Sequence, residues 1–382
     1  MPELCSTEQC VGCGACACSC PVTCIRMEAD AEGFRYPAID ETQCIQCGRC
    51  EKACPVLNFR SSVSGGDAYA VHNRSADVVR SSSSGGVFTA LAEQTIRDGG
   101  AVYGAAFEPD FSVAHRRVDT MEALASLRGS KYVQSDLGRT YTRVRQDLKA
   151  SRPVLFSGTP CQVAALRQFL GHDDPRLLCV DIICHSVPSP KVWRSYLESL
   201  GKAAAVNFRD KRESWQGYYL AVGLEDGREV LVRGRDNRYM SAFIQGLSTR
   251  PACYQCHFKG DHRAGDITLG DFWSVETVCP DAFHKEGTSL ILIQSEKGQA
   301  AFDAIADALD AVAVDREKTL AGNPAYVVAA RPHEQRSLFF EQLEQTSFVA
   351  LVDSLLPPAG REPKQSCVLR ALRKIKRILH HG

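Results

Sequence analysis

The chain has 382 residues, 44% of them hydrophobic and 24% charged, and its 45 lysines and arginines balance its 45 aspartates and glutamates. This composition is typical of a soluble globular protein with two or three domains, and the charge balance gives no reason to expect binding to nucleic acid. The 18 cysteines follow a start without a secretory signal pattern, and no apolar run is long enough for a membrane helix, so we expect reduced thiols in a cytoplasm.

Residues 10–54 contain one cysteine spacing twice. The pattern C-x2-C-x2-C-x3-C-P occurs first at Cys10, Cys13, Cys16 and Cys20 and again at Cys44, Cys47, Cys50 and Cys54. Three closely spaced thiolates can bind one face of an iron–sulfur cube, while the fourth, held apart by the proline, faces the neighbouring cube. The runs therefore predict two [4Fe–4S] clusters, with these metal ligands: Cys10, Cys13, Cys16 and Cys54 for one, and Cys44, Cys47, Cys50 and Cys20 for the other.

Two structural zinc sites are the alternative, because zinc also binds four cysteines, but zinc ligands usually come as two separated pairs. A disulfide framework fits the spacing less well still. Residues 5–60 instead resemble a two-cluster bacterial ferredoxin.

Between the runs, residues 25–28 and 34–39 are expected to form a hairpin whose turn is closed by Gly33. A Ser/Gly-rich linker at 61–66 marks a domain boundary. Strands are then predicted at 68–71, 99–107, 152–156 and 177–183, and helices at 87–96, 136–150, 161–170 and 190–200. This alternation predicts an α/β domain with a largely parallel or mixed sheet.

Farther along, residues 206–233 are expected to form polar, aromatic strands with turns at Gly217, Gly223 and Gly227, followed by amphipathic helices at 299–313 and 338–356. A last helix, 366–379, combines an apolar face with basic side chains. It is expected either to bind an anionic membrane surface or an acidic partner, or to pack on its own domain.

The fold class predicted is α+β or α/β, with a ferredoxin-like module followed by an α/β domain that has a mixed sheet. The domains expected are 1–60, 67–345 (in two parts, 67–200 and 201–345) and the C-terminal helices at 346–382.

Four further cysteines are candidates for a third metal site. Cys161 and Cys184 come at the C-terminal ends of predicted strands, the edge where α/β sheets usually bind ligands. A Cys253-x2-Cys256 loop crossing that edge would complete a tetrahedral set. The spacing alone leaves open a third iron–sulfur cluster, a zinc site, a redox dithiol or unrelated buried thiols.

Five ordered blocks resemble the coenzyme F-420 hydrogenase/dehydrogenase beta-subunit family: SSGGVFTAL at 83–91, GSKYVQS at 129–135, GTPCQ at 158–162, ICH at 183–185 and GDITLGDFW at 265–273. The resemblance spans about residues 67–345. It implies an FAD-containing electron-transfer domain with its own [4Fe–4S] cluster, and it assigns Cys161, Cys184, Cys253 and Cys256 as the ligands. Ser186 departs from the family, where glycine is expected.

No G-x-G-x-x-G fingerprint is present, so the FAD is implied by the resemblance alone. Ser83, Ser84, Gly85 and Gly86 precede a helix and are a candidate phosphate cradle, with a flexible loop and an ordinary helix cap as the alternative.

Other candidate cofactor contacts are Lys131, Tyr132 and Gln134 in one block and Asp271, near Trp273, in another. An exposed lysine, a turn aspartate and core aromatic residues are the corresponding structural readings. His185 either adjusts the neighbouring cluster or is structural. No catalytic residue is identified. Six cysteines have no assigned role, and two of them, Cys18 and Cys24, are expected near the first cluster; the other four are Cys5, Cys179, Cys279 and Cys367.

The resemblance implies an iron–sulfur flavoprotein oxidoreductase that moves electrons between coenzyme F-420 (a deazaflavin) at the FAD and a one-electron partner, such as a ferredoxin, at the N-terminal clusters. A flavin accepts a hydride and releases single electrons, so flavin and clusters together convert one kind of transfer into the other. The alternatives are a ferredoxin-driven reductase of another small molecule, for example a tetrapyrrole or a saccharide-pathway intermediate, and a non-catalytic relay subunit of a larger complex.

Overall fold

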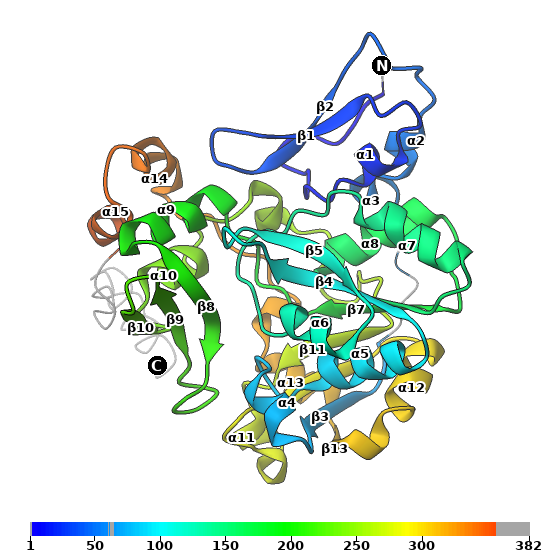
Figure 1. Cartoon of the computed structure of the whole chain (residues 1–382), viewed down its shortest axis with the longest axis vertical. Helices are drawn as coiled ribbons and strands as arrows, with labels where there is room; N and C mark the ends of the chain where they lie inside the picture. The colour runs from blue at the N-terminus through cyan, green and yellow to red at the C-terminus, as the bar shows by residue number, and fades with distance from the viewer. Residues whose placement is uncertain (1, 60, 62–64, 357–382) are drawn as a thin grey trace, which may run out of the picture.

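The computed structural model describes residues 2–59, 61 and 65–356. In Figure 1 the N-terminal segment lies above a large sheet with its helices, and a smaller sheet with its own helices lies to one side. The basic helix expected at 366–379 falls outside the described residues, as does most of the linker. Among the described residues, none of the helices has the length and apolarity needed to cross a bilayer.

The N-terminal segment is a small module built on a hairpin. Strands β1 (Ile25–Ala29) and β2 (Arg35–Ile39) pair antiparallel, and Gly33 adopts a φ of 84° in the turn between them. The predicted hairpin is therefore confirmed. Three short helices complete the module: α1 (Ala15–Ser19), α2 (Arg49–Lys52) and α3 (Pro55–Asn58).

The large sheet has eight strands in the order β13-β3-β12-β11-β7-β6-β4-β5. The four central strands β4, β6, β7 and β11 run parallel to one another, and the remaining pairs of the sheet are antiparallel. The predicted mixed α/β sheet is confirmed. Its strands are β3 (Ala68–Asn73), β4 (Ala101–Phe107), β5 (Val113–Val118), β6 (Val154–Gly158), β7 (Leu177–Ile182), β11 (Ile267–Asp271), β12 (Ser289–Ile293) and β13 (Leu309–Val314).

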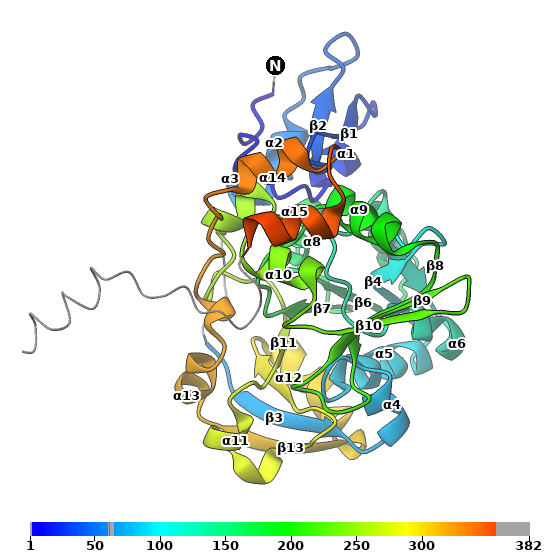
Figure 2. The ribbon, with the colours of Figure 1, turned by 90° about the vertical axis from the view of Figure 1, so that its left-hand side faces the viewer.

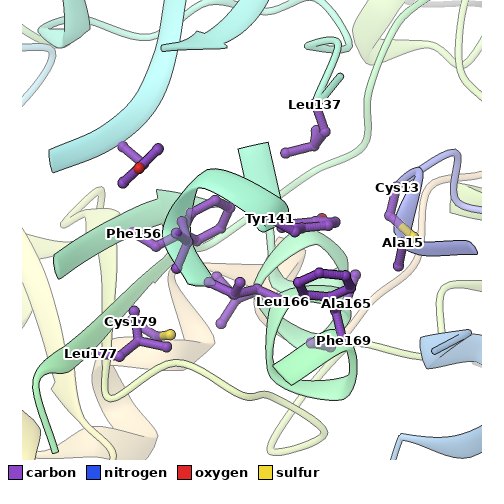
Figure 3. Close-up of a cluster of buried hydrophobic side chains, with 14 of the residues drawn as sticks. Cys13, Ala15, Leu137, Tyr141, Phe156, Ala165, Leu166, Phe169, Leu177 and Cys179 are labelled. Carbon is purple, nitrogen blue, oxygen red and sulfur yellow. The ribbon is translucent and has the colours of Figure 1, made fainter. Parts of the chain in front are cut away.

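Both faces of this sheet are covered by helices, so its central strands are apolar on both sides. In β6, Phe156 faces α7 (Thr140–Lys149) and α8 (Pro160–Leu170), whereas Leu155 belongs to the core on the opposite face with α5 (Val87–Arg97) and α12 (Glu296–Asp303). Figure 3 shows that the core around Phe156, between β6 and helices α7 and α8, also includes Cys13 and Ala15 of the N-terminal module. The module therefore shares a hydrophobic core with the large sheet.

A second body is formed by the antiparallel strands β8 (Ala203–Asp210), β9 (Tyr219–Leu224) and β10 (Glu229–Arg233). Its aromatic core includes Trp193, Phe208 and Tyr239. Figure 2 shows the helices gathered around it: α9 (Pro190–Leu200), α10 (Arg238–Ile244), α14 (Arg336–Gln342) and α15 (Phe348–Leu355). Four short helices lie elsewhere: α4 (Ala76–Arg80), α6 (Met121–Leu124), α11 (Val275–Val278) and α13 (Arg316–Ala321).

Three sequence-based expectations about these elements are wrong. The helix expected at 299–313 ends at Asp303, and residues 309–314 form edge strand β13, because pairing with β3 outweighs the apolar spacing that suggested a helix. The helix expected at 338–356 is two helices, the second beginning after Ser347. Gly223 lies inside β9, opposite Glu229, rather than in a turn.

Polar contacts also fix the N-terminal module to the rest of the chain. Gln168 of α8 donates to the Lys52 carbonyl at 2.8 Å, and Lys191 of α9 donates to the Ala31 carbonyl at 2.7 Å. Arg336 of α14 forms an ion pair with Glu32 in the hairpin turn. The hairpin and the helices of both bodies are thus held together at one junction.

Candidate functional site

The two cysteine runs fold in the same way. In each run a glycine after the second cysteine has a left-handed backbone and caps a short helix that carries the third cysteine: Gly14 (φ 70°) before α1 and Gly48 (φ 68°) before α2. The residues preceding the second cysteines, Gly12 (φ 66°) and Gln46 (φ 54°), are left-handed too. The sequence repeat therefore produces a repeat of backbone geometry.

The four cysteines of the first predicted set are buried within the N-terminal module. Cys10, Cys13, Cys16 and Cys54 are all buried. Burial, and after it the charges of Cys10 and Cys54, raises the pKa of Cys16 to about 12. Cys5, for which the sequence suggested no role, contacts this set, with its Sγ 3.9 Å from that of Cys54.

The second predicted set lines one cavity, and these thiols are Cys20, Cys44, Cys47 and Cys50. One thiol, that of Cys20, comes from the first run and three come from the second, as expected if the fourth cysteine of each run binds the cluster of the other run. Cys24 lines the same cavity, with its Sγ 3.4 Å from that of Cys20. Cys24 was expected near the first set, and its contact is with the second; Cys18 instead packs against α7 and α8 and donates to the Gly138 carbonyl at 3.3 Å.

The third candidate set also lines one cavity, composed of Cys161, Cys184, Cys253 and Cys256. Cys161 lies on the first turn of α8, whose start is fixed by a capping box between Thr159 and Gln162. Cys184 follows β7, the parallel neighbour of β6, so both cysteines come to one edge of the sheet. The loop that contains Cys253 crosses this edge and completes the set.

Cationic side chains surround this third cavity. Arg263 pairs with Asp181 at 3.0 Å, and both side chains are fully buried. Lys259 donates to the carbonyls of Cys184 at 2.6 Å and Ala325 at 2.7 Å. Burial raises the pKa of Cys184 to about 12, with the charge of Cys253 as the next cause. Positive charge in such a place stabilises clustered thiolates, which is what a metal cluster requires of its ligands.

Zinc and iron–sulfur ligation place thiolates differently. Thiolates about 2.3 Å from a zinc ion lie within about 4 Å of one another, whereas in an iron–sulfur cube each thiolate binds a different iron atom and the ligands stand farther apart. In the part of the chain that the structure describes, no group of three or more histidine, cysteine, aspartate or glutamate side chains is arranged to hold a metal ion.

The serine loop before α5 is braced by the protein itself. The Ser83 hydroxyl accepts from the Ser130 N–H at 2.7 Å, and the Ser84 hydroxyl donates to the Thr288 carbonyl at 3.0 Å. The Gly85 N–H donates to the Ser289 hydroxyl at 2.9 Å, so it is already bound. Gly86 caps α5 with a φ of 87°.

One buried and one half-buried cation that sequence reasoning missed, Arg209 and Lys211, reach this loop from β8 and the residue after it. Arg209 pairs with Asp271 at 3.0 Å and donates to the Ser83 carbonyl at 3.4 Å, while its Nε has no partner among the described residues. Lys211 donates to the Ser84 carbonyl at 3.2 Å, and burial lowers its pKa to about 8. The only signal for either residue was the basic run at 209–212 in a polar strand.

Aromatic side chains complete this second region, which we call the Arg209 site. The Tyr132 hydroxyl accepts from Arg209 at 3.3 Å. Trp273, 39% exposed, stacks on buried Trp215 with their rings 5.1 Å apart and 4° from parallel. Ser83, Tyr132 and Asp271 thus gather around one guanidinium, and Ser84 contacts Lys211 beside it.

Two predicted cofactor residues lie apart from the Arg209 site. Lys131 donates to the Arg128 carbonyl at 2.8 Å, and burial lowers its pKa to about 7. Gln134 lies at the junction with the N-terminal module, where its Nε2 donates to the Val11 carbonyl at 3.2 Å. Gln134 also borders a polar cavity of about 630 Å³ that reaches Cys13 and Arg139. His185 lines the third cavity and packs edge-on against Phe243, and its buried Nε2 has no partner among the described residues.

Comparison with known proteins agrees with this arrangement. Residues 151–317 match the family model for the C terminus of the coenzyme F420 hydrogenase/dehydrogenase beta subunit, and residues 9–58 match that for a 4Fe-4S dicluster domain. The predicted family resemblance is therefore confirmed for these segments. Together the two matches support iron–sulfur electron transfer of the oxidoreductase type.

Among solved structures, a chain of the F420-reducing [NiFe] hydrogenase complex from Methanosarcina barkeri is similar, with 15% identity over 78% of this chain and 93% of that chain and a TM-score of 0.48. A comparison with curated proteins gave no match.

Proposed function

We propose that this chain, whose residues 151–317 belong to the coenzyme F420 hydrogenase/dehydrogenase beta-subunit family and whose residues 9–58 are a 4Fe-4S dicluster domain, transfers electrons between a two-electron carrier and a one-electron partner. The observation that carries the proposal is that the first thiol set borders the cavity of the third. Val11, the residue after Cys10, also lines the cavity of Cys161 and Cys184. Clusters bound by these two sets would be neighbours, as electron transfer between them requires.

The three thiol sets are the proposed cluster ligands. Each has four cysteines, which is the donor set of a [4Fe–4S] cluster. Burial, and after it the charge of a neighbouring thiolate, raises the pKa of Cys16 in the first set and of Cys184 in the third, and cationic iron bound to the thiolates would relieve this cost. The ligands proposed are Cys10, Cys13, Cys16 and Cys54; Cys20, Cys44, Cys47 and Cys50; and Cys161, Cys184, Cys253 and Cys256.

The Arg209 site is the proposed FAD site. Lys211 supplies positive charge beside the start of α5, and Arg209, paired with Asp271, supplies a further hydrogen-bond donor there, which suits an anionic pyrophosphate. The unpartnered Nε of Arg209 supports a missing acceptor, because a buried N–H without one is costly. Trp273 offers a flat apolar face beside it. When bound, FAD supplies the conversion between hydride and single-electron transfer.

Anaerobic quantitation of iron, sulfide, zinc and flavin after reconstitution tests the proposal. We expect about twelve irons and one FAD per chain, from three four-iron sites and one flavin site. Eight irons would remove the third cluster, and a protein without flavin would be a relay rather than a converter. Zinc in place of iron would overturn the proposal.

A matched pair of variants locates the third cluster. Cys184→Ser is expected to lose about four irons, because each cube needs all four ligands. Cys279→Ser is the control, since Cys279 packs in the core beneath β3 and β12 and belongs to none of the sets. Equal iron content in both variants would contradict the assignment.

The two-electron carrier proposed is coenzyme F420, on the family match. The purified holoprotein should oxidise or reduce F420 with a one-electron dye as the second substrate. Bound FAD without F420 turnover would instead favour a ferredoxin-driven reductase of another small molecule.

A further inference from the structure

Arg250 is a buried cation at the junction between the N-terminal module and the large sheet. It is 0% exposed, and it immediately precedes the loop with Cys253. Its guanidinium donates to the Cys10 carbonyl at 2.7 Å, to the Gln134 side-chain oxygen at 3.0 Å and to the Arg35 carbonyl at 3.0 Å. All three acceptors are neutral.

The other two fully buried arginines have carboxylate partners. Arg263 pairs with Asp181 and Arg209 with Asp271, each at 3.0 Å. Across residues 2–59, 61 and 65–356, no carboxylate forms an ion pair with Arg250. Its guanidinium lies 4.3 Å from the ring centre of Tyr36 and 5.4 Å from that of Phe34, so the remaining compensation comes from aromatic rings. A buried charge needs more compensation than that, because the loss of hydration is far larger.

The groups that can supply negative charge here are thiolates. Arg250 lines the cavity of the third thiol set. On the other side, the guanidinium donates to the Cys10 carbonyl at 2.7 Å, so it also lies beside the first set. One guanidinium therefore faces the first and the third set together.

The packing at Gly12 shows that this position is built for the guanidinium. A Cβ on Gly12 would lie 2.7 Å from Arg250 Nη1 and 2.8 Å from the Gln134 Nε2. Gln46 has nearly the same backbone angle at the matching place of the second run, so the left-handed turn itself accepts a side chain. Arg250, rather than the turn, accounts for the glycine at 12.

We propose that Arg250 is the shared counter-charge of two clusters, the one on Cys10, Cys13, Cys16 and Cys54 and the one on Cys161, Cys184, Cys253 and Cys256. This rests on the proposed function. A reduced cluster carries one more negative charge than an oxidised one, and a fixed cation stabilises the reduced form. Arg250 thus raises the reduction potentials of these two clusters and leaves that of the cluster on Cys20, Cys44, Cys47 and Cys50 unchanged. It is a positioning residue that also favours electron transfer across the junction.

The experiment is an anaerobic redox titration of the full-length holoprotein, followed by electron paramagnetic resonance, with iron content measured on the same samples. Arg250→Gln removes the charge and keeps an amide donor. We expect two of the three midpoint potentials to fall, with at least a tenfold change in the ratio of reduced to oxidised cluster, which is about 59 mV for a one-electron couple. Arg250→Lys keeps the charge and should shift them less.

A second variant covers the case in which Arg250→Gln fails to fold. Gln134→Glu places a carboxylate against the guanidinium at the existing 3.0 Å contact and neutralises it without removing it. The same two potentials should fall. The matched control is Arg336→Gln, which removes a cation that spans the same junction but has its own partner in Glu32; none of the three potentials should move.

The outcomes separate this inference from the proposed function. Unchanged potentials in every iron-loaded variant, or an equal fall of all three, would overturn the role of Arg250 and leave the three clusters intact. A wild-type chain that takes up no iron would overturn both.

Discussion

The outer and inner thiol sets are built in different ways. The two outer sets come from short runs in which left-handed residues such as Gly14 and Gly48 turn the chain so that consecutive cysteines face one point. The inner set comes from three distant segments, and Cys161 and Cys184 meet only because β6 and β7 are parallel neighbours. Local spacing is enough to specify the outer sets, whereas the inner set depends on the stability of the sheet.

The largest loss of stability at the inner set is expected from Asp181→Ala. This substitution on β7 leaves the buried guanidinium of Arg263 without its partner, which costs about 3–5 kcal/mol of unfolding free energy. Anaerobic denaturant titration measures the loss, and iron analysis should show the inner four irons lost before the outer eight. The control is Asp310→Ala, which removes a half-exposed ion pair with Arg74 and should cost less than about 1 kcal/mol.

Acid is also expected to destabilise the large sheet, through His115. His115 of β5 is buried between the Ser135 hydroxyl, at 2.9 Å, and the Ser157 carbonyl, at 3.0 Å, and burial lowers its pKa to about 4. Between pH 6.5 and 4, His115 is protonated in the unfolded chain but neutral in the folded chain. The free energy of unfolding therefore falls as the pH falls through this window. The contribution is about 3 kcal/mol, since each pKa unit is worth about 1.4 kcal/mol.

Unfolding free energies measured from pH 7 to pH 4 check this expectation. His115→Gln keeps hydrogen-bonding groups but cannot titrate, so its curve should be flatter than that of the wild type. Parallel curves would show that His115 is not the source of the acid sensitivity.

A smaller effect sharpens the contrast within the outer sets. Gly12→Ala adds a methyl group against Arg250, whereas Gly14→Ala adds one whose nearest neighbour is Met27 Cγ at 3.9 Å. Both place an L-residue in the left-handed region, at a cost of about 1–2 kcal/mol. Only Gly12→Ala should cost more than that in denaturant titration. Equal losses would mean that the guanidinium moves aside freely.

The smallest expected effect concerns the junction. The Ser189 hydroxyl accepts from the Lys191 N–H at the start of α9 and donates to the Glu32 carbonyl in the hairpin turn. Ser189→Ala should lower the unfolding free energy by about 1 kcal/mol through the lost helix cap. Ser75→Ala, at the cap of α4 and remote from the junction, is the matched control. If the hydrogen bond from Ser189 to the Glu32 carbonyl contributes stability beyond the helix cap, Ser189→Ala should lower the unfolding free energy more than Ser75→Ala does.

Local structure could be predicted from the sequence where a short motif determines its own backbone conformation. The spacing of the runs, and the serines and glycines before α5, predicted local structure because short-range turns decide it. The split of 338–356 and strand β13 were missed, since tertiary pairing chose between structures that the local pattern allowed.

The residues of the Arg209 site were predicted less well than the cysteine sets. Arg209 and Lys211 reach the serine loop from a strand more than a hundred residues later in the chain, and no motif announces them. Gln134 shares a sequence block with Tyr132, yet it lies at the junction with the N-terminal module. Neighbours in an extended segment point in different directions, so a block can serve two sites.

The position of β3 has a consequence for synthesis on the ribosome. This strand follows the N-terminal module directly, but its two partners, β12 and β13, are among the last strands of the described chain to emerge. Until they do, both edges of β3 stay unpaired, and pairing across so long a loop is slow. We therefore expect chaperone binding to matter most while β12 and β13 emerge, when the edges of β3 are still unpaired, rather than while the N-terminal module assembles.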